Sequence, residues 1–159
     1  MRLRPRTRAD LETIVGWIPD ARALYLFTGP VLSWPVRADD IERVQVERRA
    51  SAWVMVEDED ASDVLGHVDL SPDEDALRLG RVIVSPAHRG RGLGRELTRL
   101  ALRAAKELGA ERVSLNVIDG NQAAIRTYAG LGFTADGSGG DDAIRMTRAL
   151  DDLEEPRAR

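Results

Sequence analysis

Two spacings of apolar residues divide this sequence into segments. Apolar residues every three or four positions predict amphipathic helices, and alternating or continuous apolar runs predict strands. The helical spacing occurs at about 8–17, 21–27, 39–50, 93–108 and 121–129. The strand spacing occurs at about 3–6, 52–57, 64–70, 77–84, 112–118, 133–135 and 143–150. This order predicts an α+β domain with a mixed, mainly antiparallel central sheet of about six or seven strands and helices on both faces.

Capping residues and helix breakers set the expected ends of these elements. Thr7 or Asp10 caps the first helix and Pro19 ends it, while Gly109 stops the helix at 93–108. The inward-facing residues expected in that later helix are Leu97, Leu100, Ala101 and Leu108. Polar turns are expected at 58–62 and 71–75, an irregular loop at 29–35 and a flexible run at 137–142.

Composition narrows the possible classes of protein. The 159 residues, 43% of them hydrophobic, suit one domain at 1–150 followed by a charged, frayed tail at 151–159. A net charge of -4 gives no general attraction to nucleic acid. The absence of cysteine excludes disulfides, thiolate metal sites and a cysteine nucleophile. No apolar run reaches the roughly 20 residues of a membrane span, and no apolar segment follows the charged start, so a cytoplasmic protein is expected.

A glycine-rich loop at 89–95 follows the predicted strand at 77–84 and opens the helix at 93–108. Glycines at 90, 92 and 94 let the backbone turn tightly and let a ligand approach closely. The unpaired N–H groups and the dipole of the following helix attract an anion, most naturally a phosphate or diphosphate. Three arginines add positive charge around that anion: Arg89, Arg91 and Arg95.

Two other phosphate-binding loops fit this segment poorly. A P-loop needs Gly-Lys-Ser/Thr, but Gly94 is followed by Arg95 and Glu96. A dinucleotide fingerprint needs an acidic residue at the end of the second strand, and Glu111 precedes its strand instead.

The segment from Val82 to Arg95 resembles the acetyl-CoA signature of the GNAT superfamily of N-acetyltransferases. A second match follows the strand at 113–118. It comprises Asn121, Ala124 and Tyr128, then Leu131-Gly132-Phe133. Both segments occur in the family's order and spacing, and together they cover about 82–133.

The resemblance implies acetyl transfer from acetyl-CoA, as a co-substrate and without a metal, to a primary amine by direct attack on the thioester. The implied cofactor-binding residues are Val82, Ile83, Val84, Arg89, Gly90, Arg91, Gly92, Leu93, Gly94, Arg95, Asn121, Ala124 and Tyr128. Val82 and Val84 would offer main-chain groups to the pantetheine arm, because family members splay this strand from the next. Their side chains also fit a plain core strand.

Tyr128 is the candidate general acid, because a phenol with a pKa of about 10 is protonated at neutral pH. The alternative is a helix tyrosine that packs on the core. Asn121 would fix the pantetheine or the loop by amide hydrogen bonds, and it also fits a helix N-cap.

The general base is less clear. One branch of the family places a glutamate where this chain has Asn116, and an amide cannot accept a proton at neutral pH. His67 is an alternative base with Asp69 as its orienting partner, since alternation places both on one strand face with Leu65. A solvent-facing strand surface fits the same pattern, and ordered water could serve instead of a side chain.

Residues in the first half of the chain, where the family varies most, would form the pocket for the acceptor. Candidate pocket residues are Tyr25, Phe27, Trp34 and Pro35, which equally suit a packed loop. The acidic residues that could attract a polyamine or aminoglycoside-like cation, or simply be solvated, are Asp39, Asp40, Asp69, Asp73 and Asp75. The acceptor is expected to be a small-molecule or protein amine, with no nucleic acid or membrane partner.

A second hypothesis is a non-catalytic acyl-CoA-binding sensor or regulatory module on the same fold. A homodimer is plausible in either case, because the edge of the closing hairpin needs cover.

Overall fold

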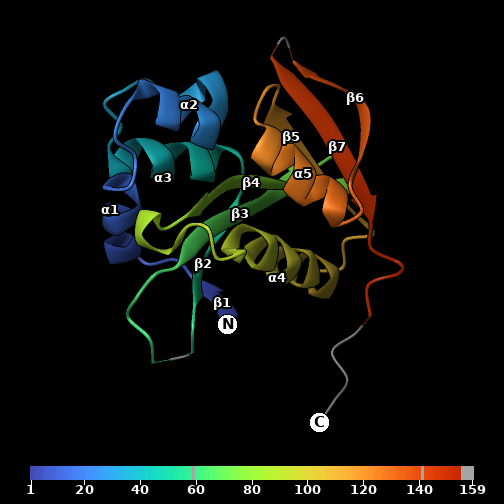
Figure 1. Ribbon diagram of the computed structural model, residues 1–159, viewed down its shortest axis with the longest axis horizontal. Helices are drawn as coiled ribbons and strands as arrows, with labels where there is room; N and C mark the ends of the chain where they lie inside the picture. The colour runs from blue at the N-terminus through green and yellow to red at the C-terminus, as the bar shows by residue number, and fades with distance from the viewer. Residues whose placement is uncertain (59, 141, 155–159) are drawn as a thin grey trace.

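In the part of the chain that the computed structural model describes, seven strands form one sheet in the order β1-β2-β3-β4-β5-β7-β6 (Figure 1). The structure describes residues 1–58, 60–140 and 142–154. Among these described residues only the β4–β5 pairing is parallel, so the mixed, mainly antiparallel sheet predicted from the sequence is confirmed. The strands are β1 (Arg2–Pro5), β2 (Ser51–Val56), β3 (Gly66–Asp73), β4 (Ala76–Val84), β5 (Arg112–Ile118), β6 (Thr134–Gly140) and β7 (Ala143–Ala149).

Helices cover both faces of the sheet, as predicted. They are α1 (Arg8–Val15), α2 (Ala21–Thr28), α3 (Ala38–Glu47), α4 (Leu93–Glu107) and α5 (Gln122–Gly130), with short 3₁₀ turns η1 (Gly29–Val31) and η2 (Pro86–His88). Thr7 caps α1 in a capping box with Asp10, so both expected capping residues take part. No helix among the described residues has the length and apolar character needed to cross a bilayer.

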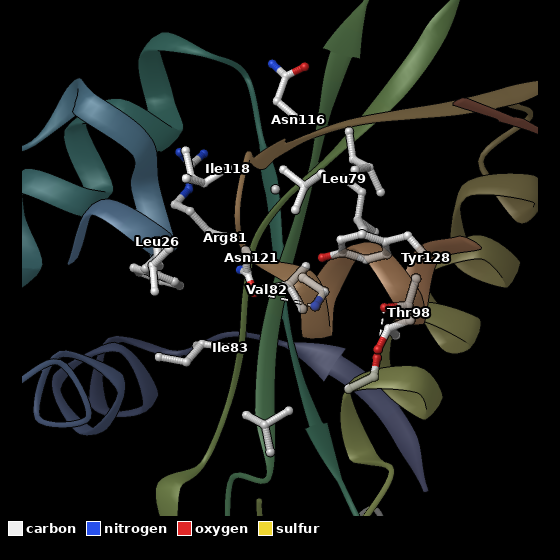
Figure 2. Close-up of a pocket in the computed structure, with 18 residues that line it drawn as sticks. Leu26, Leu79, Arg81, Val82, Ile83, Thr98, Asn116, Ile118, Asn121 and Tyr128 are labelled. Atoms are coloured by element: carbon white, nitrogen blue, oxygen red, sulfur yellow. Dashed lines mark hydrogen bonds between the residues drawn. The ribbon is translucent and has the colours of Figure 1, made fainter. Parts of the chain in front are cut away.

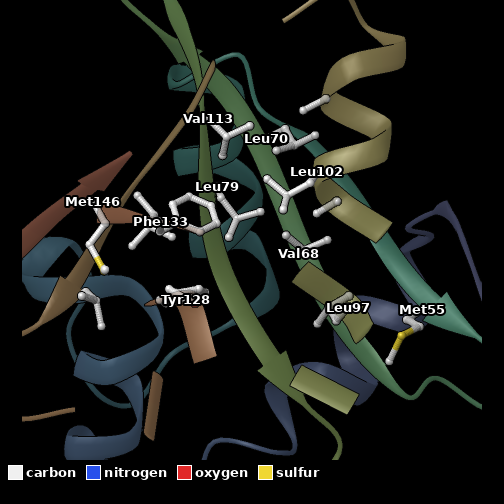
Figure 3. Packing of buried hydrophobic residues seen from close by; sticks show 14 of the residues in the cluster. Met55, Val68, Leu70, Leu79, Leu97, Leu102, Val113, Tyr128, Phe133 and Met146 are labelled. Atoms are coloured by element: carbon white, nitrogen blue, oxygen red, sulfur yellow. The ribbon is translucent and has the colours of Figure 1, made fainter. Parts of the chain in front are cut away.

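Two hydrophobic clusters lie on opposite faces of the sheet. Alternation in β2 separates them, because Met55 belongs to the cluster under α4 and α5, whereas Val54 and Val56 pack with α1, α2 and α3. Figure 3 shows the first cluster, in which Leu97 and Leu102 of α4 meet side chains of the central strands. The glycine-rich loop therefore rests on one core, and the first three helices rest on the other.

Several boundary predictions were wrong, among them the end of α3, which lies at Glu47 and not near Ala50. Helix α1 ends at Val15, before the expected end near Trp17. Leu108 follows the last residue of α4 and is 58% exposed, because the helix ends before that side chain can turn inward. The expected turn at 71–75 is mostly strand, because residues 71–73 of β3 pair with residues 76–78 of β4 and leave only Glu74 and Asp75 in the turn.

The chain after β7 is held against the core as far as it is described. Leu153 packs on the cluster under α4, and its carbonyl accepts a hydrogen bond from Lys106. The remainder of the tail expected to fray, residues 155–159, lies outside the described residues. The run at 137–142 expected to be flexible is strand as far as Gly140, and residue 141 lies outside the described residues.

A β-bulge interrupts the ladder between β3 and β4. Asp69 pairs with Gly80 and His67 pairs with Ile83, so three steps on β4 oppose two on β3. Arg81 occupies the extra position at φ 46°. A left-handed backbone costs a residue with a Cβ about 1–2 kcal/mol, so the surroundings must hold it there.

Side chains of β3 provide that support. Nδ1 of His67 lies 2.7 Å from the Arg81 carbonyl, which can only accept, so Nδ1 carries the proton. Nε2 therefore accepts from Nη1 of Arg6, at 3.0 Å. The Arg81 guanidinium donates to Asp69, and Gln45 of α3 accepts from Arg6. His67, Asp69 and Arg81 are all buried, and this set of hydrogen bonds fixes the backbone of the bulge.

The sequence placed His67 and Asp69 correctly on one strand face, but Leu65 does not share it. Leu65 precedes β3 and packs in the cluster under α4, whereas His67 meets the ring of Phe27 edge-on from the other side. The alternative of a solvent-facing surface was wrong, because helices cover both faces of β3.

Burial of His67 makes stability depend on pH. Burial lowers the pKa of His67 from 6.5 to about 3, whereas the unfolded chain binds a proton near 6.5. The unfolded state therefore binds more protons between these two pH values. We expect the free energy of unfolding to fall as pH drops through this window, by up to about 1.4 kcal/mol per pH unit from this group.

Urea unfolding at a series of pH values measures this dependence, with His67→Asn as the reference because it lacks the titrating ring. The wild type should lose stability more steeply than the variant below pH 6. Equal slopes for the two proteins would show that His67 is not held neutral in the folded state.

Candidate active site

A cavity opens where β4 and β5 separate. The two strands pair only at Leu77–Val113 and Arg78–Ser114, and then diverge. The space between them, which we call the wedge cavity, has a volume of about 190 Å³. It is lined by residues 79–84 of β4 and 115–118 of β5. Figure 2 shows α5 and α4 on one side of this wedge cavity and α2 on the other. Because the strands no longer pair, the inner edge of β4 is open to a ligand along this length.

The three consecutive residues Val82, Ile83 and Val84 line this edge. All three are only partly buried, although they lie in the middle of the sheet. Val82 and Val84 pack toward α4 and α5, and Ile83 packs toward α1 to α3. Their side chains hold the strand in both cores, as the core-strand interpretation required, while their main chain borders the cavity.

The glycine-rich loop turns from β4 into α4 at the end of this cavity. Gly90 and Gly92 have φ values of 78° and 73°, in the left-handed region that favours glycine. A Cβ at either position would meet nothing within 4 Å, so backbone conformation, not space, requires glycine there. Gly92 is the N-cap of α4, and Leu93 is buried beneath the loop.

Gly94 differs from the other two glycines. It lies inside α4 with ordinary helical geometry, lines the wedge cavity, and a Cβ there would make only a 3.9 Å contact with Val84. Neither the fold nor its packing therefore requires glycine at this position.

The arginines of the loop are exposed and lie on different sides of it. Arg89 reaches back to the Val84 carbonyl, with Nε at 3.4 Å. Arg91 lines a separate cavity beside His88 and Asp63. Arg95 extends toward the end of α5, so that a Cβ on Gly130 would lie 3.0 Å from its guanidinium. The three charges thus surround the N-terminus of α4.

Tyr128 projects from α5 into the wedge cavity, and Figure 2 shows its hydroxyl directed toward the space beside β4. The side chain is 9% exposed, and its ring meets Phe133 edge-on at 5.7 Å between centroids. Burial raises the pKa of Tyr128 to about 12. No described residue hydrogen-bonds its hydroxyl, so this protonated O–H is available to a ligand in the cavity.

Asn121 begins α5 as its N-cap. Its side chain accepts a hydrogen bond from the Ala124 amide at 3.4 Å, which confirms the N-cap interpretation. Both residues also line the wedge cavity. The structure therefore brings the second motif, from Asn121 to Tyr128, against the strand that leads into the first.

His67 is poorly placed to accept a proton from a substrate. Both ring nitrogens are engaged, by the Arg81 carbonyl and by Arg6, and the low pKa makes the ring a weak base at neutral pH. Asp69 does not orient His67 either, because it binds Arg81 instead. These two candidates support the bulge of β4 and do not form a catalytic pair.

A second cavity, of about 280 Å³, adjoins the first. The two share lining residues on β4, β5 and α2: Leu26, Phe27, Leu79, Gly80, Arg81, Asn116 and Ile118. The irregular loop predicted to wall the acceptor pocket contributes Gly29, Pro30 and Val31 through η1. Arg48, Ser71 and Arg78 complete its polar lining together with Asp69. Neither Arg48 nor Arg78 was predicted, because Arg48 lies far from both motifs and Arg78 precedes the first motif as an ordinary position of β4.

Most of the other acceptor candidates lie elsewhere. Phe27 lines both cavities, but Tyr25 lines neither, is half-buried and donates to Asp142, and Trp34 is 42% exposed. Neither Tyr25, Trp34 nor Pro35 lines a described cavity between the strands.

The acidic candidates are largely neutralised by neighbours. Asp39 pairs with Arg8 and Asp73 pairs with Arg78 and Arg145, while Asp40 caps α3. Asp75 lines a different cavity near the end of α4. These carboxylates do not form an acidic site.

Known proteins with similar sequences are acetyltransferases. The mycothiol acetyltransferase of Mycobacteroides abscessus is 54% identical over 50 residues, which cover 31% of this chain and 17% of that protein. N-acetyltransferase 8F1 of Rattus norvegicus is 33% identical over 104 residues, covering 62% of this chain and 46% of that protein. The chain thus spans less than half the length of either relative.

Solved structures share the whole fold at low identity. The spermidine N-acetyltransferase of Vibrio cholerae, in complex with CoA and spermine, has a TM-score of 0.73 at 22% identity, covering 93% of this chain and 94% of that one. A domain from Methanocaldococcus jannaschii has a TM-score of 0.77 at 19% identity, covering 92% and 96%.

The family model described as the acetyltransferase (GNAT) family matches residues 17–133. This range includes the glycine-rich loop, the diverging strands and the motif on α5. The chain therefore belongs to the GNAT acetyltransferase family.

Proposed function

We propose that this protein catalyses acetyl transfer from acetyl-CoA to a primary amine, by direct attack of the amine on the thioester. The observation that carries the proposal is the separation of β4 from β5 beside the glycine-rich loop. One open strand edge and one anion-binding helix terminus lie end to end, and acetyl-CoA is an extended molecule with amides along its arm and a diphosphate at its far end.

The diphosphate would bind the amides of residues 90–95 at the start of α4. The first N–H groups of a helix have no partner within it and carry the positive end of the dipole. Gly90 and Gly92 hold these amides in a tight turn with open space before them. Arg89, Arg91 and Arg95 add charge from three sides, and Leu93 anchors the turn in the core.

The pantetheine arm would lie along Val82, Ile83 and Val84 and pair with their main chain as an added strand. Such pairing uses backbone hydrogen bonds, so it leaves the valine side chains free to hold the core. Asn121 and Ala124 would border the arm from α5.

The bulge at Arg81 would polarise the thioester. Its extra residue takes the main chain of Arg81 and Val82 out of the ladder with β3, so an amide there is free to donate to the acyl oxygen. A donor fixed in advance by buried side chains needs no rearrangement as charge develops on that oxygen, and one such donor is typically worth about 10²–10³ in rate.

Tyr128 would protonate the sulfur as CoA leaves. Its pKa of about 12 keeps the phenol protonated at any physiological pH, and its hydroxyl has no described hydrogen-bond partner. Deprotonation of the amine falls to water, because Asn116 is not basic and His67 is engaged at both nitrogens.

The alternative of a non-catalytic acyl-CoA-binding module is favoured by one observation, the amide at Asn116 on the wall shared by the two cavities. Turnover decides between the two functions. Release of CoA with a panel of amines supports the enzyme, whereas tight binding of acetyl-CoA without release on any amine supports the module.

The substitution Gly94→Ala tests acetyl-CoA binding at a position where folding does not require glycine. The added methyl would project toward the wedge cavity, where it obstructs a bound ligand but meets only Val84 in the protein. We expect the Kd for acetyl-CoA, measured by calorimetry, to rise about tenfold or more. The melting temperature should stay the same or rise, because alanine favours a helix by up to about 1 kcal/mol over glycine. Unchanged affinity would contradict the proposed binding mode.

Tyr128→Phe tests the general acid. We expect kcat to fall about 10²-fold with little change in the Kd for acetyl-CoA, because only the proton donor is removed. Released CoA can be followed with a thiol reagent without background, since the chain has no cysteine. The other tyrosine of the chain supplies the control: Tyr25→Phe should leave kcat within about twofold, because Tyr25 does not line the wedge cavity. Equal kcat values for the wild type and Tyr128→Phe would exclude this role.

A further inference from the structure

We propose that the second cavity binds the acceptor and selects amines that also carry an anionic group, a carboxylate or a phosphate, which Arg48 holds. This inference rests on the proposed acetyl transfer and specifies its substrate class. It follows from the position of the cavity, from its charge and from its apolar walls.

The position follows from the shared lining. Leu79, Gly80 and Arg81 of β4 face both cavities, so a molecule in the second cavity would lie across this strand segment from one in the first. Arg81 is also the bulge residue. An amine in the second cavity would therefore approach the part of β4 at which the acyl group is polarised.

The charge of the second cavity is positive. Three guanidinium groups line it, from Arg48, Arg78 and Arg81, and Asp69 is the one acidic residue in the lining described. Asp69 is already paired with Arg81, and Arg78 is paired with Asp73.

Arg48 is an exposed residue whose guanidinium is not bound directly to any described carboxylate, although Asp69 and Glu47 lie near enough to offset part of its charge. It follows α3 at the helix C-terminus, and among the described residues it forms no ion pair or side-chain hydrogen bond. Burial, and then the charges of Arg81 and Arg78, lower the pKa of Arg48, which fits a guanidinium held near others of its kind. An anion is the ligand that such a group lacks.

A polyamine suits this cavity poorly. A cationic chain would have to approach Arg48, which forms no ion pair among the described residues. Asp69 is bound to Arg81 through one carboxylate oxygen, so only its buried Oδ1 remains for a cation. The same positive field favours the neutral form of an incoming amine, because nearby cations lower the pKa of an ammonium group. The field thus helps to supply an amine able to attack without a protein base.

The walls on the remaining sides are apolar. They come from Leu26, Phe27, Pro30, Val31, Ile118 and Ala143. The acceptor should therefore combine three parts: an amine, an anionic group and an apolar body. Amino acids with apolar side chains have this composition, with the carboxylate as the anion.

Calorimetry on the protein saturated with CoA tests the inference without turnover. The probes are the twenty standard L-amino acids, the C-terminal amides of those that bind, phosphoethanolamine and spermidine. We expect at least one anionic amine to bind about tenfold more tightly than its uncharged amide and than spermidine. Tighter binding of the amino acids or of phosphoethanolamine identifies the anion as a carboxylate or a phosphate.

Arg48→Gln should remove this preference, raising the Kd of the anionic amine about tenfold while leaving that of the amide unchanged. Arg48→Lys should retain part of it, and Arg48→Glu should reverse it in favour of spermidine. Arg49→Gln is the matched control, because Arg49 lies at the same helix end but lines a different cavity.

Two results would overturn the inference: no anionic amine binds better than its amide or spermidine, or Arg48→Gln leaves the preference intact. Either result leaves the proposed acetyl transfer standing if acetyl-CoA still binds and any amine still releases CoA. Failure of acetyl-CoA to bind at all would instead count against the proposed function itself.

Discussion

The candidate site depends on one departure from regular structure, the parting of β4 from β5 after Arg78 and Ser114. Paired strands satisfy each other's main-chain donors and acceptors, and separated strands leave those groups to water or to a ligand. Here the separation occurs between two strands in the middle of a seven-stranded sheet, with helices packed on either face. The molecule thus presents backbone hydrogen-bonding groups inside a rigid frame, which is an unusual position for them and a useful one for binding an extended ligand.

The departure is stabilised by polar side chains that the core would otherwise exclude. A buried histidine, a buried aspartate and a left-handed arginine all carry a cost, which their mutual hydrogen bonds offset in part, since Oδ1 of Asp69 has no described partner. Gly80 belongs to the same arrangement, because a Cβ there would lie 2.9 Å from Oδ1 of Asp69. The bulge, the ion pair between Asp69 and Arg81, and the bond from His67 are therefore best understood together as the support of the open strand edge.

Features of the fold and the site could be predicted from the sequence where the interacting residues are close together along the chain. The glycine-rich loop and the α5 motif were predicted well, because their geometry depends on residues a few positions apart, such as Gly92 at the helix start or Asn121 as a cap. The roles of His67 and Asp69 were not, because their partners Arg6 and Arg81 come from other parts of the chain. Strand alternation shows which residues share a face but not whether helices cover it. Arg48 was missed for the same reason, since only the folded chain places the end of α3 beside β4.

The two hydrophobic clusters divide the molecule into parts that can change separately. The loop and α5 rest on the cluster under α4, whereas α2, which walls the second cavity, rests on the opposite one. Substitutions that reshape the wall around α2 and η1 need not disturb the packing beneath the glycine-rich turn. A protein built in this way can acquire a new acceptor during evolution by remodelling one layer, while the proposed binding site for the acyl donor is inherited intact in the other.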